Sequence, residues 1–217
     1  MKSGNASAVR KPSLLLRAYT LTVNVNHAPH LGEHNGRLLL TLANCKPGIR
    51  SVARKGEWVA AITPKKMGYR LAYLMRVGGS WTRAEYWQKF KRTRKDSIYK
   101  PTPGGRFKLL KNPFHDASNY VRDTKCNLIL WSNVFYYFAE PYDRGETDPH
   151  GLVLDTRYES LCRSMRTQYG FLVHVPDDFV QWVKTQPGKL KNLRILYSEI
   201  RHPCGNCQPK RKQCRTE

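Results

Sequence analysis

The chain has 217 residues and a formal net charge of +22 at pH 7, because 38 Lys and Arg residues outnumber 16 Asp and Glu residues. Hydrophobic residues make up 40% of the chain and aromatic residues 11%, which excludes a wholly disordered basic tail. The sequence contains no apolar run of about 18 residues and no apolar secretory core, so we expect a cytoplasmic protein without a membrane span. The positive charge predicts a polyanionic partner, with nucleic acid as the first candidate.

The N-terminal half is predicted to contain short strands separated by turns. Residues 1–13 are polar and basic, and we expect them to form a flexible N-terminus. Alternating apolar residues with many β-branched side chains predict three strands, at residues 14–25, 56–62 and 69–77. The last two strands are expected to pair as a hairpin, because a turn with Pro and Gly joins them. Residues 37–42 fit either a strand or a helix, and residues 49–54 predict a short helical turn.

The C-terminal half is predicted to mix helices and strands. Thr82 is expected to cap a helix that ends near Phe90, and Glu85 completes a capping box. Residues 91–125 are rich in Pro, Gly, Lys and Asn and predict a long insertion, a kind of segment that is often functional in compact domains. The remaining predicted elements are strands at 126–131, 134–138 and 171–175 and helices at 155–168 and 179–184.

This pattern predicts an α+β domain over residues 14–200, because strands and helices do not alternate regularly. We expect a curled, mostly antiparallel sheet with flanking helices. The glycine motifs of dinucleotide-binding folds and of P-loops do not occur, which excludes those standard nucleotide sites. Residues 201–217 form a separate basic tail that is rich in Cys.

The tail contains a candidate structural zinc site. Cys204 and Cys207 form a CxxC turn that directs two thiolates to one tetrahedral site, and His202 and Cys214 are candidates to complete it. The second CxxC pair of common zinc motifs is missing. A basic tail without metal is therefore the alternative.

One block of the sequence resembles a known family. Residues 40–50 are Leu-Thr-Leu-Ala-Asn-Cys-Lys-Pro-Gly-Ile-Arg, and Gly56, Glu57 and Trp58 begin the next predicted strand. This block is similar to the second of the nucleotide modification associated domain families, which are found mainly in bacteria and phages. Weaker likeness to the same family follows further along the chain, in the same order as in the family, at residues 85–87, 96–99 and 135–138. The resemblance implies association with systems that modify DNA bases, and it leaves open whether the domain catalyses or binds.

The hairpin predicted over residues 56–77 is also similar to the hairpin of PUA-like and EVE-like barrels. Those domains bind nucleic acids, and several of them hold an extruded or modified base in an aromatic pocket. The likeness concerns the fold alone. It implies a PUA/EVE-like barrel as the form of the curled sheet.

Candidate nucleic-acid-binding residues combine cations with aromatic rings, because an extruded base stacks on rings while the backbone phosphates need Lys or Arg. Lys46 and Arg50 flank a Pro-Gly turn at a helix start, where an anion is also favoured. The complete candidate set is Lys46, Arg50, Tyr86, Trp87, Arg92, Arg94, Tyr99 and Tyr137. The alternative is that the aromatic members belong to the hydrophobic core.

A catalytic role requires a nucleophile or an acid–base pair. Cys45 is adjacent to Lys46, and a nearby cation favours the reactive thiolate form of a Cys. His115 and Asp96 both belong to the predicted insertion and are candidates to meet at one site. A buried, inert Cys and solvated loop residues are the alternatives. The sequence therefore leaves open whether the protein is an enzyme.

The leading interpretation is a DNA-binding component of a base-modification or modified-base-sensing system in bacteria or phages. It would hold a base in an aromatic pocket, with DNA favoured over RNA, and other proteins of such a system as further partners. One alternative is an enzyme that chemically modifies a nucleotide base. A second is a basic structural RNA-binding protein. A membrane partner is not expected, because the sequence has neither a basic amphipathic helix nor a lipidation motif.

Overall fold

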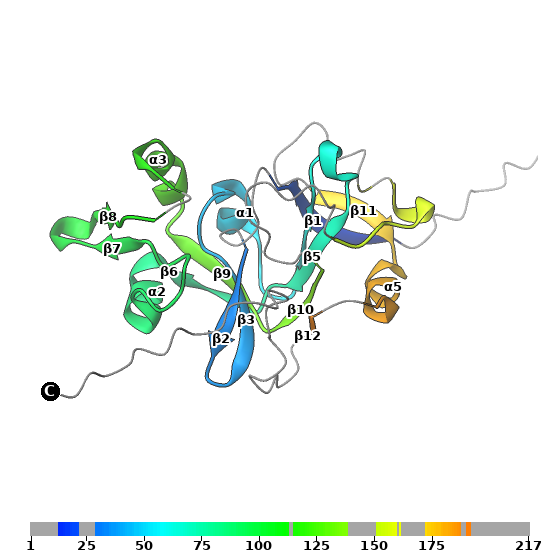
Figure 1. The fold of residues 1–217 in the computed structure, drawn as a ribbon, viewed down its shortest axis with the longest axis horizontal. Helices are drawn as coiled ribbons and strands as arrows, with labels where there is room; N and C mark the ends of the chain where they lie inside the picture. Colours follow the sequence, from blue (N-terminus) through cyan, green and yellow to red (C-terminus); the bar gives the residue numbers. More distant parts are fainter. Residues whose placement is uncertain are drawn as a thin grey trace, which may run out of the picture.

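The computed structural model describes residues 13–21, 29–112, 115–138, 151–159, 161, 172–187 and 190–191. Within these residues the chain forms a mixed α+β fold, with three sheets and four α-helices (Figure 1). The α+β class expected from the sequence is therefore confirmed. No helix in this part of the chain is long and apolar enough to cross a membrane.

The largest sheet contains six strands, in the spatial order β11 (Leu172–Pro176), β1 (Ser13–Thr20), β4 (Trp58–Ile62), β5 (Leu71–Arg76), β10 (Val134–Tyr137) and β12 (Leu190–Lys191). β1 and β4 are parallel neighbours, and all the other neighbouring pairs are antiparallel. The hairpin predicted from residues 56–77 is confirmed, because β4 pairs directly with β5.

The second sheet contains four antiparallel strands, in the order β2 (His30–His34), β3 (Arg37–Leu42), β9 (Leu128–Ser132) and β6 (Gly79–Thr82). The third is a short hairpin of β7 (Tyr99–Pro101) and β8 (Phe107–Leu109). Among the described residues both larger sheets end at open edges. The predicted PUA/EVE-like barrel is therefore not confirmed. The predicted mostly antiparallel arrangement is confirmed, because β1–β4 is the one parallel pair among the described strands.

Four α-helices and three short 3-10 turns lie beside these sheets: α1 (Pro47–Val52), α2 (Arg83–Phe90), α3 (Ala117–Thr124), α5 (Phe179–Thr185), η2 (Lys65–Met67), η3 (Pro103–Gly105) and η4 (Thr156–Tyr158). The predicted capping box begins α2. The Thr82 hydroxyl accepts the Glu85 amide at 3.2 Å, and the Glu85 carboxylate accepts the Thr82 amide at 2.6 Å. Two amide groups at the helix start are thereby satisfied.

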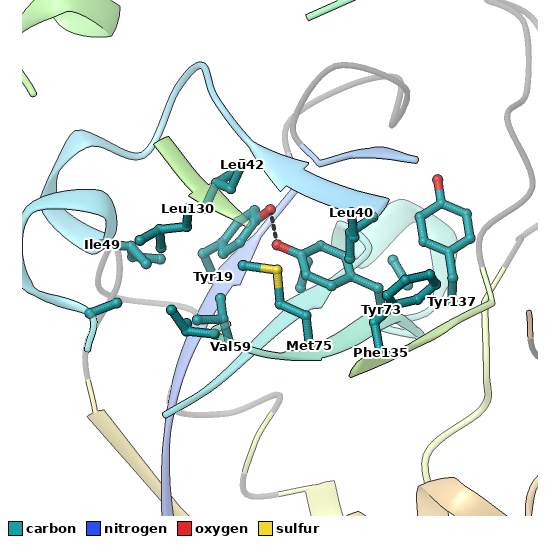
Figure 2. Close-up of a cluster of buried hydrophobic side chains, with 14 of the residues drawn as sticks. Tyr19, Leu40, Leu42, Ile49, Val59, Tyr73, Met75, Leu130, Phe135 and Tyr137 are labelled. Atoms are coloured by element: carbon teal, nitrogen blue, oxygen red, sulfur yellow. Dashed lines mark hydrogen bonds between the residues drawn. The ribbon is translucent and has the colours of Figure 1, made fainter. Parts of the chain in front are cut away.

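The central core lies between the two larger sheets. Figure 2 shows this cluster, in which the hydroxyls of Tyr19 on β1 and Tyr73 on β5 are hydrogen-bonded to each other. A second cluster packs the outer face of the six-stranded sheet against α5 and η4. A third packs the outer face of the four-stranded sheet against α2. The layers therefore run from α5 through two sheets to α2, with three separate apolar contacts between them.

Some expectations from the sequence need correction. Residues 91–125 are not an irregular insertion, because β7, β8 and α3 all form within them. Residues 37–42, which fit either a strand or a helix in the sequence, form the strand β3. Where a helix was predicted over residues 155–168, the structure has the short 3-10 turn η4, at whose start the Asp155 carboxylate accepts the Arg157 amide; residues 160 and 162–168 lie outside the described residues.

The predicted domain boundaries fall at the edges of the described part of the chain. Residues 1–12 and 192–217 lie outside the described residues. The four candidate zinc ligands are among them: His202, Cys204, Cys207 and Cys214. Both the flexible N-terminus and the zinc-binding tail therefore stay predictions.

Candidate catalytic site

Cys45 lies in a strained turn between β3 and α1. Its backbone φ angle is 55° and that of Lys46 is 43°, so two consecutive residues with side chains adopt the left-handed region. Such conformations cost roughly 1–3 kcal/mol each and persist only where the surroundings impose them. Here the Asp123 carboxylate accepts the Cys45 amide at 2.9 Å, and the Arg50 guanidinium donates to the Cys45 carbonyl at 2.8 Å. Hydrogen bonds to both the amide and the carbonyl of Cys45 therefore hold the turn in this conformation.

Three reactive side chains meet at this turn. The sulfur of Cys45, a ring nitrogen of His115 and a carboxylate oxygen of Asp123 all lie within 4.8 Å of one another. His115 Nδ1 is 2.5 Å from Asp123 Oδ2, and both side chains are buried. Cys45 is half-buried. The structure thus joins Cys45 and His115, two of the three residues that the sequence singled out for catalysis, and adds a carboxylate.

Hydrogen bonds within the cluster determine its protonation. Burial alone would lower the pKa of His115, but hydrogen bonds to Asp123 and Cys45 outweigh burial and raise this pKa to about 9. Burial alone would raise the pKa of Asp123, but the His115 contact, the Cys45 amide and the Tyr99 hydroxyl lower it to about 2. At neutral pH the pair is therefore an imidazolium and a carboxylate.

The Asp123 residue is fixed in place through both its side chain and its backbone. Besides the Cys45 amide and His115, the carboxylate accepts the Tyr99 hydroxyl at 2.9 Å. Its backbone carbonyl accepts the guanidinium of Arg50 at 2.7 Å and that of Arg83 at 2.6 Å. Asp123 has no exposed surface. These contacts, drawn from four segments of the chain, orient the carboxylate toward His115.

Two cations belong to the surroundings of Cys45. Arg122 Nη2 lies 3.5 Å from this sulfur, and the Arg122 side chain is 52% exposed. Lys46 donates from Nζ to the Thr20 carbonyl at 2.9 Å and lies over the Tyr19 ring, and burial lowers the pKa of Lys46 to about 8. Arg122 is therefore the cation that contacts the sulfur directly.

Asp96, the third predicted catalytic residue, lies in a different buried network. Its carboxylate accepts the Tyr86 hydroxyl at 2.5 Å and the Thr41 hydroxyl at 2.6 Å. Arg94 lies 3.7 Å from this carboxylate and donates to the Tyr86 hydroxyl at 2.9 Å. All four side chains are buried. The network joins α2 to β3 and is a structural arrangement, separate from the Cys45 cluster.

The other predicted binding residues are distributed between core and surface. Arg50 is fully buried and donates to four backbone carbonyls, those of Cys45, Asp123, Cys126 and Leu128. Tyr137 belongs to the core between the sheets (Figure 2). Trp87 is half-buried, whereas Arg92 is exposed and donates to the Lys111 carbonyl at 3.2 Å. The structure therefore does not gather these residues into one aromatic pocket.

The Cys45 cluster also has the donor atoms of a transition-metal site. A thiolate, an imidazole and a carboxylate form a common zinc ligand set. In this arrangement the Asp123 oxygens already contact four donor groups, those of the Cys45 amide, the Tyr99 hydroxyl, the Arg122 guanidinium and the His115 ring. The same three atoms are therefore candidate metal ligands as well as partners for proton transfer.

Sequence reasoning missed Asp123 and Arg122. Both belong to α3, which lies within the segment that was expected to be irregular. One local signal was available, because Asp116 is a favoured N-cap residue and its carboxylate accepts the Ser118 amide at 2.8 Å. That signal predicts the helix, but it does not indicate that α3 meets the Cys45 turn.

Residues 16–102 match the family model described as nucleotide modification associated domain 2. The family resemblance predicted from the Cys45 block is therefore confirmed over this segment, which includes Cys45. His115 and Asp123 lie beyond the matched segment. No curated protein and no solved structure is significantly similar to the chain.

Proposed function

We propose that this chain, in which residues 16–102 match nucleotide modification associated domain 2, is a thiol-dependent enzyme of a nucleotide-modification system. The observation that carries the proposal is the convergence of Cys45, His115 and Asp123 at hydrogen-bonding range. A nucleophile, a base and a group that orients the base form the common pattern of covalent catalysis. The system belongs to bacteria or phages, as the family implies, and to the cytoplasm, where thiols stay reduced.

Each member of the cluster has a distinct role. At neutral pH His115 is already an imidazolium, so in this proposal it acts as the counter-ion of a Cys45 thiolate, and Asp123 holds the charged ring in place. The thiolate then forms a bond from sulfur to an electrophilic carbon of the nucleotide, and the imidazolium protonates the leaving group as the bond to that group breaks. Water, or a second substrate with a hydroxyl or amino group, gives a proton back to His115 and releases the fragment from sulfur.

Arg122 is suited to bind the anionic part of the substrate. Its guanidinium is next to the Cys45 sulfur and is half exposed, so a phosphate can reach it from solvent. Arg122 also contacts Asp123 and Asn119, but half of its side chain stays in solvent, whereas the Lys46 ammonium is directed inward to the Thr20 carbonyl and the Tyr19 ring. We therefore assign substrate binding to Arg122 and support of the strained turn to Lys46.

Nucleic-acid binding without catalysis is the second candidate function. The net charge of +22 and exposed cations such as Arg92 favour it. An aromatic base pocket has weaker support, because Tyr86, Tyr99 and Tyr137 are all buried. The Cys-rich tail, as a predicted zinc site, is compatible with either function.

Replacing single Cys residues tests the enzymatic proposal. The protein would be produced in a bacterial host, and nucleosides from digested DNA and from the free nucleotide pool would be compared by mass spectrometry. We expect an altered nucleoside with the wild-type protein and its loss with Cys45→Ser. Cys126→Ser is the matched control, since Cys126 is a free buried Cys outside the cluster.

Alkylation of the purified protein by iodoacetamide gives a second readout that needs no substrate. We expect Cys45 to react about tenfold or more faster than Cys126, and His115→Ala to remove most of that difference, because the imidazole assists formation of the thiolate. Equal alkylation of Cys45 in the wild-type and His115→Ala proteins, together with unchanged nucleosides in every sample, would contradict the enzymatic proposal.

A further inference from the structure

The hairpin of β7 and β8 presents a surface that carries only positive charge. Residues 97–115 contain four cationic residues and no acidic residue. The four cations, all exposed, are Lys100, Arg106, Lys108 and Lys111. Arg92 extends the same surface, because it is exposed and donates to the Lys111 carbonyl at 3.2 Å. This surface lies at the end of the molecule opposite α5 (Figure 1).

Two of these cations face each other directly. Lys100 on β7 is the register partner of Lys108 on β8, so both side chains project from the same side of the hairpin. Like charges at directly opposite positions of an antiparallel pair are unfavourable. The folded hairpin therefore retains a repulsive pair on its solvent side, and a bound anion would relieve that repulsion.

The other side of the hairpin anchors it next to the Cys45 cluster. Tyr99, which precedes Lys100, donates its hydroxyl to the Asp123 carboxylate at 2.9 Å. The Arg83 guanidinium lies over the rings of Tyr99, at 4.7 Å, and Phe107, at 5.9 Å. The Phe107 amide donates to the Tyr120 hydroxyl on α3 at 3.4 Å. The cationic side is thus held at a fixed position relative to Cys45.

We propose that this cationic hairpin binds the phosphate backbone of a DNA strand and brings one nucleotide of that strand to Cys45. The inference rests on the proposed function and deepens it, because it makes the substrate a polymer. Four cations spaced along an arm suit a row of phosphates, whereas a single free phosphate would need donors that converge on one point. The charge of the arm is complementary to DNA along its whole length.

Binding of a fluorescently labelled single-stranded DNA oligonucleotide tests the inference. The full-length protein would be compared with the double variant Lys100→Ala/Lys108→Ala and with a matched control, Lys65→Ala/Lys184→Ala. Both double variants lose two exposed charges, and the control positions lie on η2 and α5, away from the hairpin. We expect about tenfold weaker binding for the hairpin variant and less than about twofold for the control. The slope of log affinity against log salt concentration should become less negative by about 1.4, because two phosphate contacts are lost.

Loss of folding does not explain the expected result, because the hairpin substitutions remove a repulsive pair. The thermal unfolding temperature of Lys100→Ala/Lys108→Ala should equal or exceed that of the wild type. Equal weakening in both double variants would overturn the inference, since total charge would then determine binding. Two further results would also overturn the inference. In both, the hairpin variant binds DNA as tightly as the wild type does. It instead loses affinity for phosphatidylserine vesicles, or for a single-stranded RNA of the same sequence.

The same variants separate this inference from the proposed function. If Cys45→Ser abolishes nucleoside change while the hairpin variant binds DNA like the wild type, the hairpin inference fails alone. If the hairpin variant loses DNA binding while Cys45→Ser leaves the nucleoside change intact, the catalytic assignment fails and the hairpin inference stands.

Discussion

Cys45 and Lys46 show how a strained turn is held at the scale of a few atoms. Neither is a glycine, yet both have positive φ angles. The conformation is stable because the Cys45 amide and carbonyl are both hydrogen-bonded, to Asp123 and Arg50. The backbone of Cys45 therefore depends on the same carboxylate that orients His115. Reactivity and local strain are coupled through Asp123.

The His115–Asp123 pair predicts a titration near pH 9. We expect His115 in the wild type to titrate at about pH 9, as followed by NMR of its ring protons, because the pKa of its imidazole is raised to about 9. In Asp123→Asn the negative partner is lost and the Cys45 contact alone opposes burial, so the midpoint should fall clearly below that of the wild type. A midpoint near 9 in both proteins would contradict the assigned contact.

The same pair predicts how stability depends on pH. The pKa of His115 is higher in the folded state, so its stabilising contribution is complete below about pH 6.5 and is lost as pH rises through about 9. The pKa of Asp123 is lower in the folded state, so its contribution is complete above about 3.8 and is lost as pH falls through about 2. The free energy of unfolding in urea should be higher for the wild type than for Asp123→Asn. This difference between the two proteins should be larger at pH 6 than at pH 9.5.

At the scale of elements, the site depends on α3 and the β7–β8 hairpin. α3 supplies Asp123 and Arg122, and the hairpin supplies Tyr99, whose hydroxyl bonds to Asp123. Neither element is long enough to be stable by itself in water. They are stable because α3 packs on β8 and on α1, and β7 packs on α2. This mutual dependence explains why a segment rich in turn residues forms regular structure.

Removal of the Tyr99 hydroxyl tests the coupling between these elements. Tyr99→Phe leaves the ring under Arg83 but removes one donor to the buried Asp123 carboxylate. We expect a loss of about 1 kcal/mol in the free energy of unfolding, measured with urea, and slower alkylation of Cys45. Unchanged stability and alkylation in Tyr99→Phe would show that this contact does not support the site.

The strand β3 illustrates why some elements were ambiguous in the sequence. Leu38, Leu40 and Leu42 face the core between the sheets, while Leu39 packs against α2. A strand that is buried on both faces has no alternation of apolar and polar residues. Its apolar run is therefore compatible with a strand or a helix until its neighbours are known.

At the scale of the whole molecule, the charge opposes the compact form. The net charge is +22, and among the described residues the ion pairs are few, with Arg17–Glu57 and Arg157–Asp178 as examples near the surface. Unpaired positive charges repel one another through the surrounding water. The two-sheet core with its covering helices must therefore offset this repulsion as well as the loss of chain entropy.

This balance predicts that salt stabilises the protein. Raising NaCl from 20 to 300 mM shortens the screening length and weakens repulsion between exposed cations. We expect the thermal unfolding temperature to rise by about 2–4 °C, which corresponds to roughly 1 kcal/mol for a chain of this size. A fall in the unfolding temperature with salt would mean that attractive ion pairs outweigh the repulsion.

The sequence by itself determined the features that depend on neighbouring residues. It predicted the α+β class, the β4–β5 hairpin, the capping box of α2 and the family of the segment around Cys45. These features follow from periodicity, turn chemistry and a conspicuous local motif, all of which can be read over a few residues.

Only the tertiary structure decided which of the reactive residues meet. Cys45 and Asp123 are 78 positions apart, and their contact arises because β3, α1 and α3 converge. Asp96 and His115 belong to the same segment, yet burial directs Asp96 into a network with Tyr86 and Thr41. A site formed by contacts between distant residues has no local pattern. Its members become apparent once packing has brought their atoms within hydrogen-bonding distance.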